Sequence, residues 1–430
     1  MLKAKPNGVG EEMISWARDL YPIKRSITGP GVRMTLNYLK SLLPDLNVCA
    51  IDSGEKVFDW TIPDEWTLRE AYIQDKNGKK IVDVESHGLH VVGYSHAIDI
   101  EMDLENLQKH LHSLPDQPNA IPYITSYYNR TWGFCISEND RQKLRPGMYK
   151  IKIDADLKPG VLNYADLVLP GQSEKEIVFS TYICHPMMAN NELSGPVVTT
   201  ALARWLQKRD RRYTYRFIFI PETIGAITYI KRNLKHLKDK THAGFVVTCI
   251  GDERAYSFLP SRNGETIADR TALYILRRYI PEFNSYSFLE RGSDERQYCS
   301  PLVDLPFVSI MRSKYGTYPE YHTSLDDFSL VTARGLEGGL AALQATVDAL
   351  EKNYTYKNVF QCEPQLSKHG LYPSMSSKNS GLTVRNMMNL LTYTDGKTDL
   401  LGVSEKINIT IDEAATIADR MVECGVLKRT

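Results

Sequence analysis

Three segments of the sequence place potential metal ligands where strands end and helices or loops begin. His185 follows the run STYIC, and Asn191 and Glu192 come shortly after it in the loop PMMANNELSG. Glu222 comes directly after FIFIP, and His322 lies in the acidic segment YPEYHTSLDD. Imidazole and carboxylate groups are ligands that zinc prefers in hydrolytic sites, which keep one position open for water. Each segment is ambiguous alone, but the three together predict a zinc centre.

Glu222 is the candidate general base. Zinc lowers the pKa of a bound water towards about 7, and a nearby carboxylate that is not itself a ligand is then needed to accept the proton. Glu222 stands at the end of an apolar strand, where it can face such a water. The same side chain could instead cap the helix that it opens.

The elements expected around these residues are buried strands alternating with helices. From Glu176 onward the chain contains the strands EIVFSTYI, RFIFIP, GFVVTCI and FVSIM, separated by helices over 196–208, 222–238, 265–279 and 332–352. Near-continuous apolar strands of this kind indicate an α/β fold whose mostly parallel sheet is covered by helices on both faces. Ligands bind such sheets at the carboxyl ends of the strands, which is where the three segments lie.

The remaining regions predict additional domains. Residues 1–47 contain two amphipathic helical stretches, and we expect them to join 158–360 in one discontinuous domain. Short apolar runs separated by Pro, Gly and Asn over 48–157 predict an inserted β-rich domain. The capped helix TIDEAATIADRMVECG and its neighbours resemble a winged helix-turn-helix over 366–430. Several domains agree with a length of 430 residues, which exceeds what one core normally serves.

Composition excludes several classes of protein. Lys and Arg together number 52, as do Asp and Glu, so no net charge draws the whole molecule to nucleic acid or to an anionic membrane. The seven cysteines are scattered and form no Cys-x-x-Cys pair, which argues against a disulfide framework. No apolar run reaches the roughly 18 residues of a membrane span, and the N-terminus lacks a signal-peptide core. We therefore expect a cytoplasmic protein without membrane contact.

The C-terminal tail is acidic, although the winged-helix fold predicted for it suggests DNA as a partner. Residues 386–430 hold more acidic than basic side chains, whereas DNA binding depends on positive charge facing the phosphates. DNA is therefore a disfavoured partner in spite of the winged-helix pattern. A protein contact or self-association into a homo-oligomer fits an acidic helical module better.

The order of the motifs resembles a known superfamily. A histidine, an Asn-rich loop with Ser-Gly, a glutamate after a strand, Gly-Ser-Asp and His-Thr follow one another as in the zinc aminopeptidases, a superfamily that includes bacterial leucyl aminopeptidases and glutaminyl cyclases. More narrowly, stretches such as TSYYNRTWGFC, CHPMMANNELSGP and GSDERQYCSP are similar to a bacterial family of aminopeptidase-like proteins associated with surface-polysaccharide gene clusters. The resemblance implies a zinc-aminopeptidase-like sheet sandwiched by helices, with an inserted β-rich domain and a C-terminal winged helix.

The resemblance also implies roles for single residues. His185 corresponds to the first histidine ligand and His322 to the last. Asn191 stands where relatives carry a bridging aspartate, Thr223 where they carry a glutamate ligand, and Thr248 where they carry an aspartate. Because three carboxylates are replaced, the resemblance favours one zinc ion instead of two. Its third ligand is expected to be Asn191 or the neighbouring Glu192, with Asp252 as a weaker candidate.

Further residues are candidates for substrate binding. Asp294 in GSDER resembles an active-site aspartate, although the same residue could simply stabilise a turn. Arg25, Arg296, Arg312 and Tyr315 lie in segments that resemble the pocket walls of the family. An arginine fork could bind a substrate carboxylate or phosphate, and the alternative for each arginine is an ordinary solvated position.

Two functions are compatible with this sequence. The first is a zinc-dependent hydrolase of amide bonds that acts on a small peptide-like or N-acylated amino-sugar substrate, in surface-polysaccharide metabolism. The second is a catalytically impaired aminopeptidase-like fold that serves as a binding or scaffold protein, which the replaced carboxylates favour. The metal content of the purified protein separates the two hypotheses.

Overall fold

The computed structural model describes residues 8–371 and 378–430. The chain forms two compact units, 1–343 and 344–430, and each is described by itself. In the described part of the chain, no helix has the length and apolar character needed to cross a membrane.

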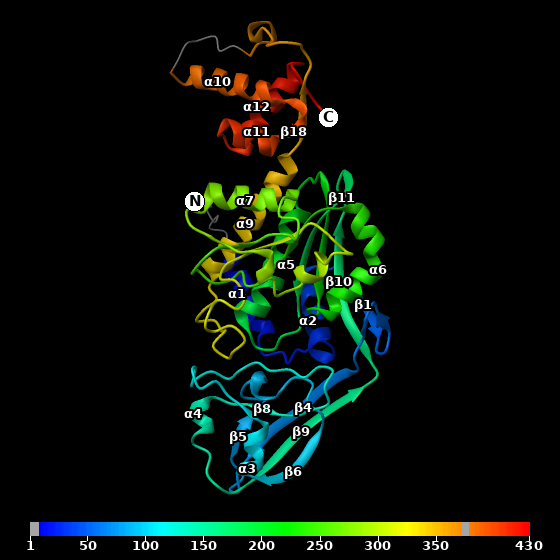
Figure 1. The fold of residues 1–430 in the computed structure, drawn as a ribbon, viewed down its shortest axis with the longest axis vertical. Coiled ribbons are helices and arrows are strands. Elements are labelled where there is room, and N and C mark those ends of the chain that lie inside the picture. The colour runs from blue at the N-terminus through cyan, green and yellow to red at the C-terminus, as the bar shows by residue number, and fades with distance from the viewer. Residues whose placement is uncertain (1–7, 372–377) are drawn as a thin grey trace. The chain divides into compact units, whose positions relative to one another are not determined.

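The larger unit is built on an eight-stranded mixed sheet (Figure 1). In spatial order its strands are β1 (Asn47–Asp52), β10 (Val161–Leu169), β12 (Tyr213–Ile220), β11 (Ser173–Tyr182), β13 (Thr241–Val246), β16 (Phe307–Met311), β14 (Ser257–Leu259) and β15 (Asn284–Ser285). The four central strands, β12, β11, β13 and β16, run parallel. Antiparallel pairings of β1 with β10, β10 with β12 and β14 with β16 extend the sheet outwards. The predicted α/β class is confirmed.

Helices cover the sheet on both faces, as the connections require. The chain passes from β11 through α5 (Ser194–Gln207) to β12, then returns through α6 (Ile224–Lys240) to β13 on the other side of β11. Right-handed crossovers in opposite directions place α5 and α6 on opposite faces. The other helices of this unit are α1 (Val9–Leu20), α2 (Pro30–Leu42), α7 (Ile267–Tyr279), the short α8 (Glu295–Tyr298) and the start of α9 (Ala333–Lys352). The reversal of direction at β11 marks the edge where ligands bind in such sheets.

The strand β11 is the centre of the core. It is buried from Glu176 to its end, as a strand covered on both faces must be. Gly195 lets α5 approach it closely, because a Cβ at that position would lie 2.4 Å from the side chain of Thr181. A substitution there would push the helix that follows the candidate site away from the sheet.

The inserted region forms a module with its own antiparallel sheet. Its strands lie in the order β5 (Lys80–Asp83), β4 (Glu65–Gln74), β9 (Met148–Lys158) and β6 (Ile98–Asp103). Short pairs join β2 (Lys56–Val57) to β3 (Trp60–Thr61) and β7 (Leu111–His112) to β8 (Phe134–Cys135). The small helix α3 (Leu104–Leu107) precedes β7, and the small helix α4 (Glu138–Arg141) follows β8. The strand β1 falls inside the expected insertion 48–157 but pairs in the central sheet.

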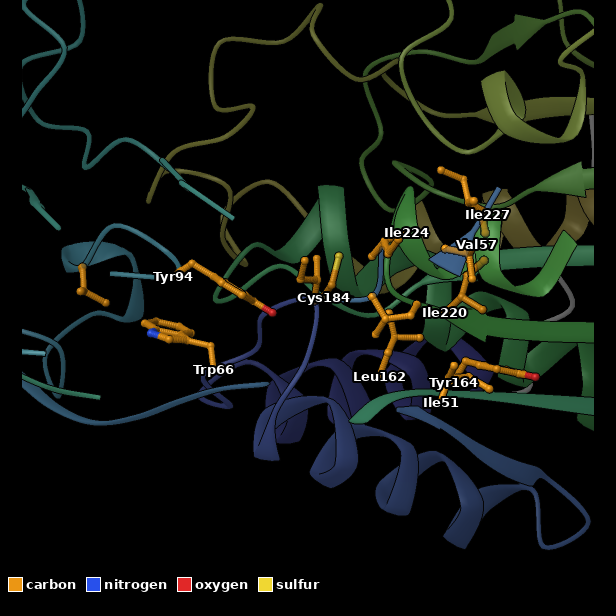
Figure 2. Packing of buried hydrophobic residues seen from close by; sticks show 14 of the residues in the cluster. Ile51, Val57, Trp66, Tyr94, Leu162, Tyr164, Cys184, Ile220, Ile224 and Ile227 are labelled. Carbon is orange, nitrogen blue, oxygen red and sulfur yellow. The ribbon is translucent and has the colours of Figure 1, made fainter. Parts of the chain in front are cut away.

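The core of the module is continuous with that of the central sheet. Figure 2 shows Trp66 and Tyr94 of the module on one side of Cys184, and Ile220 and Ile224 from the region of β12 and α6 on the other. Trp66 and Tyr94 stack with ring centroids 5.8 Å apart. Because one apolar cluster connects both parts, the module can hold loop residues firmly against the end of the central sheet.

The smaller unit has a winged-helix arrangement. Its helices are α10 (Lys378–Tyr393), α11 (Leu400–Ile407) and α12 (Ile411–Glu423), and its three-stranded sheet has the order β18 (Asp395–Asp399), β17 (Thr355–Asn358) and β19 (Leu427–Arg429). Thr410 and Glu413 form the capping box of α12, as the Thr-led motif predicts. The strand β17 precedes the expected start at residue 366, because its pairing with β19 at the end of the chain leaves no local sequence signal.

Candidate active site

The candidate residues lie just beyond the carboxyl ends of β11, β12 and β16. His185 follows β11 by three residues, and Glu222 follows β12 by two. His322 lies in the long loop after β16. This placement is the one that the alternating strands and helices predict, since the ends of adjacent parallel strands meet at one edge of the sheet.

His185 and Glu222 are in direct contact. The Nε2 atom of His185 lies 3.4 Å from Oε2 of Glu222, and the ring centroids of His185 and His322 are 5.6 Å apart. His185 is buried and His322 is half-buried, so the three side chains form a partly enclosed polar cluster. Zinc–nitrogen bonds of about 2.1 Å place two imidazole ligands with ring centres roughly 5 to 6 Å apart, so this ring spacing is compatible with a shared ion.

The backbone at Glu222 is held in an unusual conformation. Thr223 has φ 63° and ψ −80°, a region that a β-branched residue rarely occupies. Its amide donates a 2.7 Å hydrogen bond to Asp294, and its hydroxyl accepts a 2.6 Å hydrogen bond from Arg296. Asp294 and Arg296, both predicted site residues, therefore support the turn that presents Glu222.

Glu192 and Arg25 lie behind His185. Glu192 comes from a π-helical turn, Ala189–Leu193, and its Oε2 atom lies 2.8 Å from Nδ1 of His185. The side chain of Arg25 is fully buried, lies 3.5 Å from the other oxygen of Glu192, and donates a 2.9 Å hydrogen bond to the carbonyl of His185. A carboxylate on Nδ1 fixes the imidazole and leaves Nε2 free to face Glu222. Both residues position His185.

Among the described residues, the group of three potential ligand atoms that lie close together includes neither His322 nor Glu222. It consists of Cys184, His185 and Glu192, whose donor atoms lie within 4.8 Å of one another. A cation is disfavoured there, because Arg25 already neutralises Glu192 and burial raises the pKa of the Cys184 thiol to about 11. The thiol also accepts a hydrogen bond from the amide of Glu222. These contacts favour a supporting role for this group.

The predicted ligands Asn191 and Asp252 are engaged elsewhere. Asn191 Oδ1 accepts a 2.9 Å hydrogen bond from the hydroxyl of Tyr182, which also pairs with the hydroxyl of Thr248. Both oxygens of Asp252 accept hydrogen bonds, two of them from Ser313. The geometry therefore brings neither group to Nε2 of His185, and Asn191, Tyr182 and Thr248 form an uncharged chain of hydrogen bonds.

A buried aspartate supports this uncharged chain from behind. Asp326 accepts hydrogen bonds of 2.6 and 2.9 Å from the amides of Asn190 and Asn191, and a 3.1 Å bond from the hydroxyl of Tyr318. Burial raises the pKa of Asp326 to about 7. An acidic side chain facing the amides of a helical first turn holds the loop in place.

Tyrosines form the walls of the site, and one comes from the inserted module. The ring of Tyr123 lies 5.3 Å from that of His185 and 5.1 Å from that of His322, edge to face. Its amide donates a 2.8 Å hydrogen bond to the carbonyl of His322, and its hydroxyl pairs with that of Tyr127 at 2.9 Å. The sequence gives no signal for this contact, because it depends on a bridge between Pro122 and Thr323, 201 positions apart.

The acidic groups around Glu222 differ in charge state. Burial would raise the pKa of Glu222, but its contact with His185 and the charge of Arg296 hold that pKa below its usual value. Burial and the nearby Glu222 raise the pKa of Asp294 well above its usual range, and its Oδ2 atom is buried without a hydrogen-bond partner. Burial and the charge of His185 lower the pKa of His322 to about 3. Glu222 is thus the ionised carboxylate of the cluster.

The remaining predicted substrate residues do not line this cluster. The hydroxyl of Tyr315 bonds to the carboxylate of Glu295 and accepts from the amide of Gly292, which stabilises the GSDER turn. Arg312 lines a separate cavity whose lining contains none of His185, Glu222 or His322. Of the predicted arginines, Arg296 is the exposed one that reaches the site, through Thr223.

The two sides of the site differ in how well their donor atoms suit zinc. His185 Nε2 lies 3.4 Å from the carboxylate of Glu222, and the ring centroids of His185 and His322 are 5.6 Å apart, whereas the side chains of Asn191, Thr223 and Thr248 offer neutral oxygens already used in hydrogen bonds. Zinc prefers nitrogen and charged oxygen ligands over amides and hydroxyls. On the Asn191 side, the carboxylate of Asp326 is already engaged by two amides and the hydroxyl of Tyr318, which disfavours a second ion there.

Comparisons with known proteins agree with this architecture. Residues 14–353 match the model of a family described as a domain of unknown function, DUF4910, and residues 354–429 match a winged helix-turn-helix model. A protein of Clostridium acetobutylicum is 37% identical over 421 residues, which cover 97% of this chain and 96% of that protein. Its name, given provisionally, is polysaccharide biosynthesis protein with aminopeptidase-like domain.

Solved structures show the same fold. A crystal structure from Clostridium acetobutylicum, provisionally described as a peptidase, has 36% identity and a TM-score of 0.92, covering 98% of this chain and 96% of that one. A zinc aminopeptidase of Bacillus subtilis has 13% identity and a TM-score of 0.58, covering 81% and 95%. A peptidase M28 precursor of Shewanella amazonensis has 11% identity and a TM-score of 0.57, covering 80% and 93%. At these identities the last two show the fold alone.

Proposed function

Because the chain belongs to the DUF4910 family and has the fold of zinc aminopeptidases, we propose that it is a hydrolase of amide bonds that uses one zinc ion. The substrate class is a small peptide-like molecule or an N-acylated amino sugar, and the provisional name of the Clostridium relative supports a role in polysaccharide metabolism. The fold itself does not fix the reaction, so the proposal rests on the site.

The observation that carries the proposal is the contact between His185 and Glu222 beside the ring of His322. Glu192 occupies Nδ1 of His185, so Nε2 is directed to the same space as the ionised carboxylate of Glu222. Burial favours the neutral ring, but the contacts with Cys184, Tyr123 and Glu192 hold the pKa of His185 well above its usual value. His185 would give up its proton on binding a metal ion, because a neutral imidazole is the form that ligates a metal. A carboxylate near the metal position is the form that accepts a proton. His185 and His322 would hold the ion.

The residues of the site each have a part in amide hydrolysis. Zinc, when bound, would polarise the scissile carbonyl and acidify a water molecule. Glu222 takes the proton of the attacking water and passes it to the leaving amine. Tyr321 stacks on His322 with 3.9 Å between ring centroids, and burial raises its pKa, so it keeps its proton and can donate to a developing oxyanion. Tyr123 and Tyr182 exclude water around His185.

The test of the proposal is the variant Glu222→Gln. Loss of a general base costs about 10²- to 10⁴-fold in rate, so kcat on aminoacyl anilides or N-acyl amino sugars should fall by that factor. Zinc content should stay unchanged, because the two histidines remain. Glu320→Gln is the matched control, since Glu320 lies two residues from His322 but pairs with Arg254 at the surface. Equal turnover by Glu222→Gln and the wild type would reject the assignment.

A second function is favoured by the uncharged chain of Asn191, Tyr182 and Thr248. Replacing charged ligands by a satisfied hydrogen-bond network stabilises a metal-free cleft, and such a cleft could serve a protein that binds its ligand without cleaving it. Purified protein that holds no metal under zinc-replete conditions would favour this binding function over the hydrolase.

A further inference from the structure

Arg312 carries a positive charge that the protein leaves without a carboxylate partner. The residue is 7% exposed, and its Nε atom is buried without a hydrogen-bond partner. Its guanidinium lies over the ring of Tyr256, 4.0 Å from the centroid. Among the described residues, the structure records ion pairs for the neighbouring Arg254 and Arg334 but none for Arg312. A buried charge is costly unless it is paired, so a counter-charge is expected.

Beside this guanidinium lies a cavity of about 490 Å³. It is lined by Arg312, Arg254, Arg334, Tyr256, Tyr279 and Pro281, among others. Sites for small molecules typically measure about 300 to 1,000 Å³ and combine apolar walls with a few polar groups. The cavity is therefore large enough for an organic ligand and offers aromatic surface next to the charge.

The other charged residues that line the cavity are Arg254, Arg334, Glu253 and the exposed Glu282, and all of them except Glu282 form ion pairs recorded among the described residues. Arg254 makes two 2.8 Å hydrogen bonds to Glu320, and Arg334 lies 3.4 Å from Glu253. Arg312 is thus the arginine whose charge is available to a ligand. A guanidinium binds the oxygens of a carboxylate or a phosphate through parallel hydrogen bonds.

Gly338 in α9 leaves space for the guanidinium of Arg312. A Cβ at Gly338 would lie 2.5 Å from Nη1 of Arg312 and 2.7 Å from the hydroxyl of Tyr256. Glycine inside a helix costs stability relative to alanine. The absence of a side chain at 338 therefore permits this placement of Arg312 and Tyr256.

We propose that this cavity is a second ligand site, which binds a small organic molecule through a carboxylate or phosphate group held by Arg312 and through its body against Tyr256. The site is separate from the proposed hydrolytic centre, since the cavity lining contains none of His185, Glu222 or His322. It does not depend on whether amide hydrolysis takes place.

The test measures binding of inorganic phosphate and of acetate to the full-length protein by calorimetry, at constant ionic strength set with chloride. Saturable binding of one of the two anions is expected, and the better anion identifies the group that the site recognises. Arg312→Met should weaken that binding by about tenfold or more. Gly338→Ala keeps every charge and favours the helix, yet it displaces the guanidinium, and it should weaken binding as well.

Two control variants complete the design. Arg334→Met removes an exposed, paired arginine and should change the affinity by less than about twofold. Glu222→Gln should bind the anion as the wild type does. The proposal is overturned if neither anion binds saturably, if Arg312→Met and Gly338→Ala bind like the wild type, or if binding is lost in Glu222→Gln, which would place the anion at the hydrolytic centre.

Discussion

The cleft has two sides that differ in charge. On the charged side, Glu222 lies 3.4 Å from His185, whose ring centroid is 5.6 Å from that of His322. On the neutral side, Asn191, Tyr182 and Thr248 satisfy one another by hydrogen bonds. Both sides lie at the same end of one sheet, so their difference does not come from the fold. It comes from side chains, and the proposed single zinc ion belongs to the charged side.

The buried pair of Arg25 and Glu192 supports the charged side from behind His185. Removing one partner of this pair should have the largest effect on stability. Removing one partner of a buried ion pair costs about 3 to 5 kcal/mol, because the remaining charge stays buried. Arg25→Met leaves Glu192 in that state, whereas Arg296→Met changes an exposed side chain and should cost less than about 1 kcal/mol. Urea unfolding of both variants measures the difference. Equal costs would contradict the supporting role of Arg25.

A substitution that introduces a carboxylate on the neutral side tests the difference between the two sides of the cleft. Asn191→Asp puts a carboxylate where the hydroxyl of Tyr182 now meets an amide oxygen. Without metal, the buried carboxylate should destabilise the protein by about 1 to 3 kcal/mol. With zinc, the new ligand should offset that loss, so the melting temperature of the variant should depend on zinc more steeply than that of the wild type. Asn129→Asp at the surface is the control, and an equal zinc dependence would contradict the comparison.

Asp326 should make the neutral side sensitive to pH, and its effect per pH unit is the smallest of the three effects. Its folded pKa of about 7 exceeds the value of about 3.9 for an unfolded aspartate, so the folded state binds the proton more tightly. Stability from this group is present at low pH and is lost as pH rises from about 4 through 7, by at most about 1.4 kcal/mol per pH unit. Asp326→Asn should remove this slope in unfolding measured between pH 5 and 8. If the stability of Asp326→Asn depended on pH as steeply as that of the wild type, the assignment of this pH dependence to Asp326 would be contradicted.

The sequence predicts the parts of the site that follow strand periodicity. The apolar runs before His185 and Glu222 place both at the carboxyl ends of neighbouring strands, and the structure has them there. The acidic segment around His322 marks it as a candidate, and the resemblance matches it to the last histidine ligand, although it lies after β16 in a loop without such a pattern. The fold class could be predicted for the same reason, since alternating strands and helices leave few topologies.

Other parts of the site could not be predicted from local pattern. Glu192 was expected as a ligand, yet it supports His185 from Nδ1, and only the backbone of the π-helical turn determines which side of the ring it meets. Tyr123 reaches the site through a long-range bridge, and Arg312 faces another cavity although its segment resembles the pocket walls. These placements depend on tertiary packing, which residue types and spacing do not encode locally.

The most direct test of the central claim is the zinc content of the purified protein under zinc-replete conditions. The account predicts about one ion per chain, held by imidazoles, and its loss in the double variant His185→Ala, His322→Ala, while Asn191→Ala keeps the ion. Two ions per chain, or an ion that survives removal of both histidines, would contradict a single zinc on the charged side of the cleft.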